Sequence, residues 1–117
     1  MAVGITGGTV SASAYLNFNA QTGTTYTLVA GDAENKIVTL SNAGSITLTI
    51  PPSVFTAGQQ INIAQIAAGQ VTLAQGAGVT INSNGATATA PKLRVQWSAA
   101  TIICTASNTF LVIGDIS

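Results

Sequence analysis

The sequence predicts an all-β protein: a small antiparallel sandwich, jelly-roll-like or barrel-like domain preceded by an extended N-terminal arm. Apolar residues alternate with Thr in short runs such as 46–50 and 71–73, which is the period of two of a half-buried strand. Val, Ile and Thr fill these runs, whereas Gly, Asn and Pro lie between them. Short strands spaced about 8 to 12 residues apart are typical of sandwiches and barrels.

Nine strands are expected along the chain. They cover 24–30, 36–41, 45–50, 60–66, 70–74, 79–82, 93–98, 100–105 and 109–113. Asn42, Ala43 and Gly44 form an expected hairpin loop between two of them. Pro51 and Pro52 cannot continue a ladder, because proline has no amide donor, so the segment 53–58 is expected to cross between hairpins.

Two more turn signals divide the second half of the chain. Asn84 and Gly85 form a dipeptide suited to a turn that needs positive φ. The segment 95–114 has no charged residue and has about the length that spans a bilayer, but polar residues interrupt it and Ser107 and Asn108 mark a turn in its middle. We therefore expect two strands there, and no membrane partner.

Residues 1–23 have a different composition from the body, which we place at 24–117. The segment is rich in Gly, Ala and Ser and carries one compact apolar group, Tyr15, Leu16 and Phe18. A tether of this kind gains order by docking on something else, so these three residues are the candidate partner-binding residues. A frayed terminus, or a first strand packed on its own domain, remains an open alternative. No secretory signal pattern is present, and the segment is expected to be part of the mature protein.

Charge is scarce in this chain. Three acidic and three basic side chains make up 5% of the residues, against about 25% in ordinary soluble domains. A net charge of zero promotes self-association, so the surface is expected to be neutral hydroxyl and amide groups or to be covered by protein. Nucleic acid is not an expected partner, because such binding depends on several Lys or Arg residues that neutralise phosphates.

The inventory of chemical groups argues against an enzyme. The chain has no histidine, the commonest general base and metal ligand. Asp32 and Glu34 could pair as in a glycosidase, but Lys36 continues the same strand face, and a solvated edge of mutually neutralising charges is the favoured interpretation. No spacing demands a calcium site among Asp32, Glu34 and Asp115. No catalytic residue, metal site or cofactor is expected.

Two single residues are expected in the core. Cys104 is the lone cysteine and lies in an apolar run, which is typical of a small buried hydrophobe. Trp97 alternates with Leu93 and Val95, which favours a place on the buried face of the strand 93–98.

From residue 24 to 116 the order of landmarks resembles a family of small β-rich domains found in tailed-bacteriophage virion proteins. The resemblance is carried by Tyr26–Leu28 and Asp32, Ile46–Leu48, Pro51, Phe55–Gly58, Ile61–Gln65, Gly69–Leu73, Gly76–Ile81, Gln96–Trp97 and Phe110–Ile116. It implies a structural module of a capsid decoration (cement) protein, head fibre or tail appendage, commonly a trimer. Here the module is nearly the whole sequence, which favours a decoration protein over a fibre with a long shaft.

The expected function is therefore that of a non-enzymatic virion protein. The resemblance implies that it forms homotrimers on the outer surface of a capsid assembled in the host cytoplasm, where it is expected to bridge subunits of the major capsid protein. A tail or head fibre module that binds host-surface carbohydrate is the alternative. An ice-binding surface is a third class, suggested by Thr47 and Thr49 and by Thr87 and Thr89, although these spacings are not repeated regularly along the chain.

Overall fold

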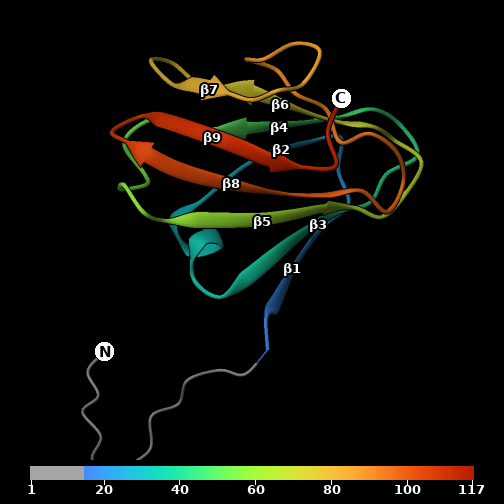
Figure 1. Ribbon diagram of the computed structural model, residues 1–117. Coiled ribbons are helices and arrows are strands. Elements are labelled where there is room, and N and C mark those ends of the chain that lie inside the picture. The colour runs from blue at the N-terminus through green and yellow to red at the C-terminus, as the bar shows by residue number, and fades with distance from the viewer. Residues whose placement is uncertain (1–14) are drawn as a thin grey trace, which may run out of the picture.

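The computed structural model describes residues 15–117, and its fold is all-β (Figure 1). A six-stranded sheet has the order β1-β3-β5-β8-β9-β7, and a three-stranded sheet has the order β2-β4-β6. The strands are β1 (Asn17–Gln21), β2 (Thr25–Thr27), β3 (Lys36–Leu40), β4 (Ile46–Ile50), β5 (Gln60–Gln65), β6 (Val71–Gln75), β7 (Thr80–Asn82), β8 (Ala99–Ala106) and β9 (Thr109–Gly114). One 3-10 helix, η2 (Ala30–Ala33), lies between β2 and β3.

The first six strands alternate between the two sheets, so that the chain winds in successive coils. β1, β3 and β5 pair in parallel in the six-stranded sheet, and β2, β4 and β6 pair in parallel in the three-stranded sheet. Of the strand pairs in the described residues, only β5–β8 and β8–β9 are antiparallel. The expectation of an antiparallel arrangement was therefore wrong for most of the body. Alternation with a period of two is the same in both kinds of sheet, so it could not distinguish them.

The turn signals mark corners as well as hairpins. The segment Asn42–Gly44 joins β3 to β4, which lie in different sheets, so the expected hairpin is a corner of the coil. Corners of successive coils stack on one another: Asn42 Nδ2 donates to the Thr22 carbonyl, and the Gly69 N–H donates to the Asn42 carbonyl, both at 2.8 Å. The turn at Ser107 and Asn108 does form a hairpin, between β8 and β9.

The core lies between the two sheets. Each strand turns alternate residues inward, and the side chains that fill the core most completely include Leu40, Leu48, Ile63, Leu73 and Phe110. Phe55 packs edge-to-face on Phe110, with ring centroids 6.1 Å apart. Cys104 is 1% exposed, which confirms its predicted burial. No helix of the described residues is long and apolar enough to cross a membrane.

Two elements differ from expectation. Residues 17–21, within the predicted arm, form β1, which pairs with β3, so the alternative of a first strand packed on its own domain holds for this part of the arm. Its pattern is inverted: Asn19 lies inward and is half-buried, while Phe18 and Ala20 are exposed, so no buried apolar alternation was visible. The predicted strand 93–98 does not form. Only an isolated bridge joins Leu93 to Ile116, and the chain then turns. Residues 1–14 of the predicted arm lie outside the described residues.

Candidate partner-binding surface

The outward side of the six-stranded sheet is the most unusual surface of this protein. Strand register places five outward side chains in one row across it: Phe18, Ile37, Asn62, Thr101 and Ile113. We call this side the outer face. Among its six strands the sole charged residue is Lys36, which alternates with Ile37 and so lies on the opposite side of β3. The outer face therefore carries no charge.

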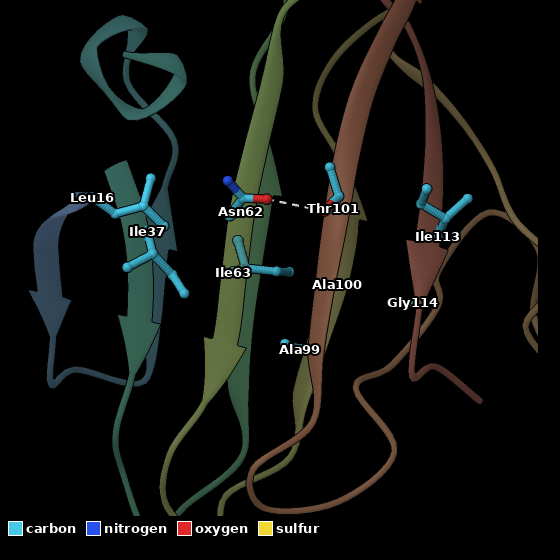
Figure 2. Close-up of a pocket in the computed structure, with 9 residues that line it drawn as sticks. All are labelled: Leu16, Ile37, Asn62, Ile63, Ala99, Ala100, Thr101, Ile113 and Gly114. Carbon is cyan, nitrogen blue, oxygen red and sulfur yellow. Dashed lines mark hydrogen bonds between the residues drawn. The ribbon is translucent and has the colours of Figure 1, made fainter. Parts of the chain in front are cut away.

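A groove of about 460 Å³ runs along the outer face (Figure 2). Leu16 and Ile37 form one wall and Ile113 the other, and small side chains such as Ala99 form the floor. In Figure 2 the side chains of Ile37 and Ile113 project from β3 and β9, and Leu16, just before β1, lies beside Ile37. The groove is open, shallow and mostly apolar, which suits a protein side chain.

Two features make the groove floor low. Thr101 Oγ1 donates to Asn62 Oδ1 at 2.9 Å, so these polar side chains satisfy each other within the sheet. Gly114 has a φ of +138°, and a Cβ there would lie 2.6 Å from the Cα of Ala100. A side chain at residue 114 is therefore excluded, and the floor between β8 and β9 stays free of bulk.

Beside the groove, three apolar side chains form a ridge. Leu111 and Ile113 on β9 are 38% and 48% exposed, and Ile103 on β8 is paired with Leu111 in the register. None of these three residues was predicted from the sequence to bind a partner. The signal was present, however, because the continuous apolar runs 102–104 and 110–113 make both sides of β8 and β9 apolar, which is typical of a sheet covered on both faces.

The three candidate partner-binding residues lie at the edge of this face. Tyr15 and Phe18 are 78% and 76% exposed, and Leu16 is 43% exposed and lines the groove. The carbonyl of Tyr15 accepts a hydrogen bond from Asn35 Nδ2 at 3.1 Å, which ties the start of the described chain to the corner before β3. The structure thus brings all three next to the uncharged outer face.

The outward side of the three-stranded sheet is chemically different. Thr25, Thr47 and Thr72 lie in one rank across β2, β4 and β6, and Thr27 and Thr49 start a second rank that ends at Ala74. These hydroxyls give a polar surface, and Lys92, which is bridged to Thr72, adds one positive charge at its edge. The ranks are regular in space although their spacing in the sequence is not, so the sequence did not reveal them. Thr87 and Thr89 lie outside the strands.

Trp97 does not lie in the core, contrary to expectation. It is 73% exposed, and its φ of +75° is incompatible with the predicted strand. The turn is held from both sides: the Trp97 N–H donates to the Gln65 carbonyl, and the Ser98 N–H donates to the Val95 carbonyl. A bulky residue in the left-handed region is uncommon and is found at constrained sites. This turn holds the indole in solvent.

An ion pair and a hydroxyl support the Trp97 turn. Arg94 binds Asp115 through two hydrogen bonds, the shorter 2.7 Å long, and Ser98 Oγ donates to Asp115 Oδ2 at 2.6 Å. The Arg94 guanidinium, with a smaller contribution from the Ser98 hydroxyl, holds the pKa of Asp115 below its ordinary value. Both partners are exposed, so the pair positions the turn and adds little to overall stability.

Asp32 is buried, and the expected solvated edge of charges does not exist there. Its carboxylate accepts hydrogen bonds from the Tyr26 hydroxyl at 2.7 Å, from Asn19 Nδ2 at 2.8 Å and from the Val29 N–H at 3.0 Å. Asp32 belongs to η2, not to a strand, so it does not share a strand face with Glu34 and Lys36. Burial, together with the hydrogen bond to Asp32, raises the pKa of Tyr26 to about 12.

These polar residues form structural clusters. No buried side-chain nitrogen or oxygen of the described residues lacks a hydrogen-bond partner, and Asn19 links the Asp32 cluster to β1. Among residues 15–117, no three His, Cys, Asp or Glu side chains are grouped so that they could hold a metal ion. No protein-family model and no curated protein matches the chain. The two outward sheet sides are therefore the features of this protein that bear on its function.

Proposed function

We propose that this protein is a non-enzymatic structural protein of a bacteriophage virion, a capsid decoration protein. In this proposal the body forms a homotrimer on the outer surface of the capsid and stabilises the shell by bridging subunits of the major capsid protein. The observation that carries the proposal is the uncharged, largely apolar outer face with Tyr15, Leu16 and Phe18 exposed at its edge. Exposed apolar patches of this kind mark protein interaction sites.

The distribution of charge supports a role in assembly. The outer face is uncharged. The charged side chains are found in the corners and near the chain end, except for Lys36 at the start of β3 and Lys92, which is bridged to Thr72 at the edge of the smaller sheet. A shell presents many identical sites, so modest contacts from each copy of a trimer add up through avidity. A decoration protein needs no catalytic group, and its surface needs only to fit its neighbours.

The proposal assigns the three N-terminal apolar residues to the capsid. Large exposed aromatic side chains with few rotatable bonds are the residues that anchor protein interfaces. Tyr15 and Phe18 are such residues, and β1 fixes Phe18 in the sheet by pairing with β3. In this arrangement the body makes the contacts between copies, and the edge formed by Tyr15, Leu16 and Phe18 binds the capsid.

Co-sedimentation with capsids that lack the protein tests this function. The full chain should bind saturably, and cryo-electron microscopy of the decorated particles should show three copies at each site. The triple substitution Tyr15→Ser, Leu16→Ser and Phe18→Ser should weaken binding by about tenfold or more, since each lost anchor costs more than 1 kcal/mol. A matched control, Val29→Ser with Val95→Ser, removes exposed apolar groups elsewhere on the body and should bind as the parent does. Unchanged binding by the triple variant would contradict the assignment.

A fibre module that binds host-surface carbohydrate is the second candidate, and Trp97 favours it. An indole held in solvent by a constrained turn, with the Gln96 amide beside it, could stack on a sugar ring. Glycan-array binding by the full chain that is lost in Trp97→Ala and kept in Val29→Ser would favour this candidate. No glycan binding, together with capsid binding by Trp97→Ala, would favour the decoration protein.

A further inference from the structure

We infer that the outer face from Ile37 to β9 is the interface between copies of this chain, and that the ridge of one copy lies in the groove of the next. The inference rests on the proposed self-association of the body, and it names the surface and the residues. The ridge is Ile103, Leu111 and Ile113; the groove lies between Ile37 and Ile113, over Ala99.

The contrast between the two outward sheet sides identifies which one is covered. The three-stranded side presents ranks of threonine hydroxyls, which bond to water without a partner. The six-stranded side presents Leu111 and Ile113, which are 38% and 48% exposed in the isolated chain, besides Phe18 at the edge that the proposed function assigns to the capsid. The polar side ends at Lys92, which is bridged to Thr72, whereas the apolar side carries no charged side chain and few polar ones. A covering protein explains the composition of the apolar side.

The parallel strands of the outer face lead to the same conclusion. β1, β3 and β5 are paired in parallel, and sheets of parallel strands are as a rule covered on both faces. One face of these strands packs on the core, whereas the other has no cover from the described residues. The side chains Ile37 and Ile113 stand above that uncovered face (Figure 2).

A second copy fits this face better than a charged partner does. With no charge on the outer face, two copies can approach without like-charge repulsion and without an ion that must lose its water. Ridge and groove lie side by side on every copy, so each copy supplies both halves of the contact. The same contact repeated around a three-fold axis closes a ring.

The size of the face limits each contact between copies. Six strands about 4.8 Å apart and roughly six residues long form a face of roughly 24 by 20 Å. A standard interface buries about 800 Å² on each partner, so the whole face is smaller than one standard interface. In a ring, each copy gives its ridge to one neighbour and its groove to the other, and the two contacts together hold the copy in place.

Sedimentation velocity of the full chain, over a range from micromolar to submillimolar concentration, tests the inference. The parent should form a discrete oligomer. Ile113→Lys places a charge on the ridge and should weaken association by about tenfold or more. Thr47→Lys places the same charge on the polar side, at a similarly exposed strand position, and should leave association unchanged. Circular dichroism of both variants checks that each is folded.

Cysteine cross-linking tests the pairing of ridge with groove. Chains with Ala99→Cys and chains with Ile113→Cys, mixed and oxidised, should form a disulfide-linked pair that contains one chain of each kind. Cys104 is buried and should not compete. Mixing Ala99→Cys with Thr47→Cys should give no such pair.

Four outcomes would overturn the inference. The parent could stay monomeric at every concentration, as it would if residues 1–14 of the same chain covered the groove. The oligomer could persist unweakened in Ile113→Lys, or Thr47→Lys could weaken it equally, or no mixed disulfide could form. Failure of capsid binding alone, with these results intact, would overturn the proposed function and leave the interface between copies standing.

Discussion

The Tyr26 hydroxyl donates a hydrogen bond of 2.7 Å to the buried carboxylate of Asp32. This bond joins β2, the first strand of the smaller sheet, to η2, and Asn19 adds β1 of the larger sheet to the same cluster. One carboxylate therefore ties together the first coil of the body. Its partners are two side chains and one backbone N–H, which leaves it well satisfied.

Stability should fall at alkaline pH through Tyr26. Its folded-state pKa of about 12 lies above the ordinary value of 10.0, so the folded protein holds this proton more tightly than the unfolded chain. The stabilisation is complete below pH 10 and is lost as the pH rises toward about 12. Urea unfolding at several pH values should show this loss in the parent and not in Tyr26→Phe. Parallel alkaline curves for the two proteins would contradict it.

At neutral pH the Tyr26→Phe substitution should itself be costly. A hydrogen bond to a charged group contributes about 1.5 to 3 kcal/mol, so the free energy of unfolding should fall by about that much. Glu34→Gln, at an exposed position two residues from Asp32, is the control and should change it by no more than about 0.5 kcal/mol.

The stacking of coil corners should depend on Gly69. A Cβ at this position would meet the carbonyl oxygens of Gly44 and Asn42, which are backbone atoms of the preceding corner. Gly69→Ala should therefore destabilise the fold at the upper end of the about 1–3 kcal/mol typical of overpacking. Gly23→Ala, whose Cβ would meet nothing closer than 3.7 Å, is the matched control in thermal unfolding. Equal midpoints for the two variants would disprove the close approach.

The sole tryptophan should report on the Asp115 carboxylate. The pKa of Asp115 lies below its ordinary value of 3.8, so the carboxylate supports the turn at higher pH and loses its bonds to Arg94 and Ser98 only as the pH falls below that value. Trp97 fluorescence should change in this acid range in the parent. Asp115→Asn should abolish the step, whereas a step that persists in this variant would assign it to another group.

Cys104 should be unreactive in the native protein. It is 1% exposed, and burial raises the pKa of its thiol, so little thiolate forms at neutral pH. A thiol-specific reagent should modify it at the rate of unfolding, and rapidly in denaturant. Fast modification of the folded protein would mean that β8 opens readily.

The sequence predicted which segments form strands better than it predicted how those strands pair and connect. The all-β class, eight of the nine expected strands and the burial of Cys104 follow from local alternation, and the structure bears them out. Pairing direction does not follow from alternation. A corner such as Asn42–Gly44 and a hairpin turn use the same residue types, so the coiled path was invisible.

The candidate surface was predicted only at its edge. Tyr15, Leu16 and Phe18 stood out as apolar residues in a small-residue segment, but Ile113 was hidden in an apolar run that also supplies the core through Val112. Trp97 was misplaced because its alternation with Leu93 and Val95 was read as a strand, whereas hydrogen bonds from distant residues hold a turn there. Long-range contacts of this kind leave no local signal.

The hairpin of β8 and β9 differs from every other pairing in the described body, because only Ser107 and Asn108 separate the segments it joins. Loop closure there costs the least entropy, whereas each parallel pairing must first bring together segments a full coil apart. Folding should thus begin at the carboxyl-terminal end, with the coils added onto that nucleus afterwards. A nascent chain leaving the ribosome would have to release both β8 and β9 before the preceding coils could fold onto them.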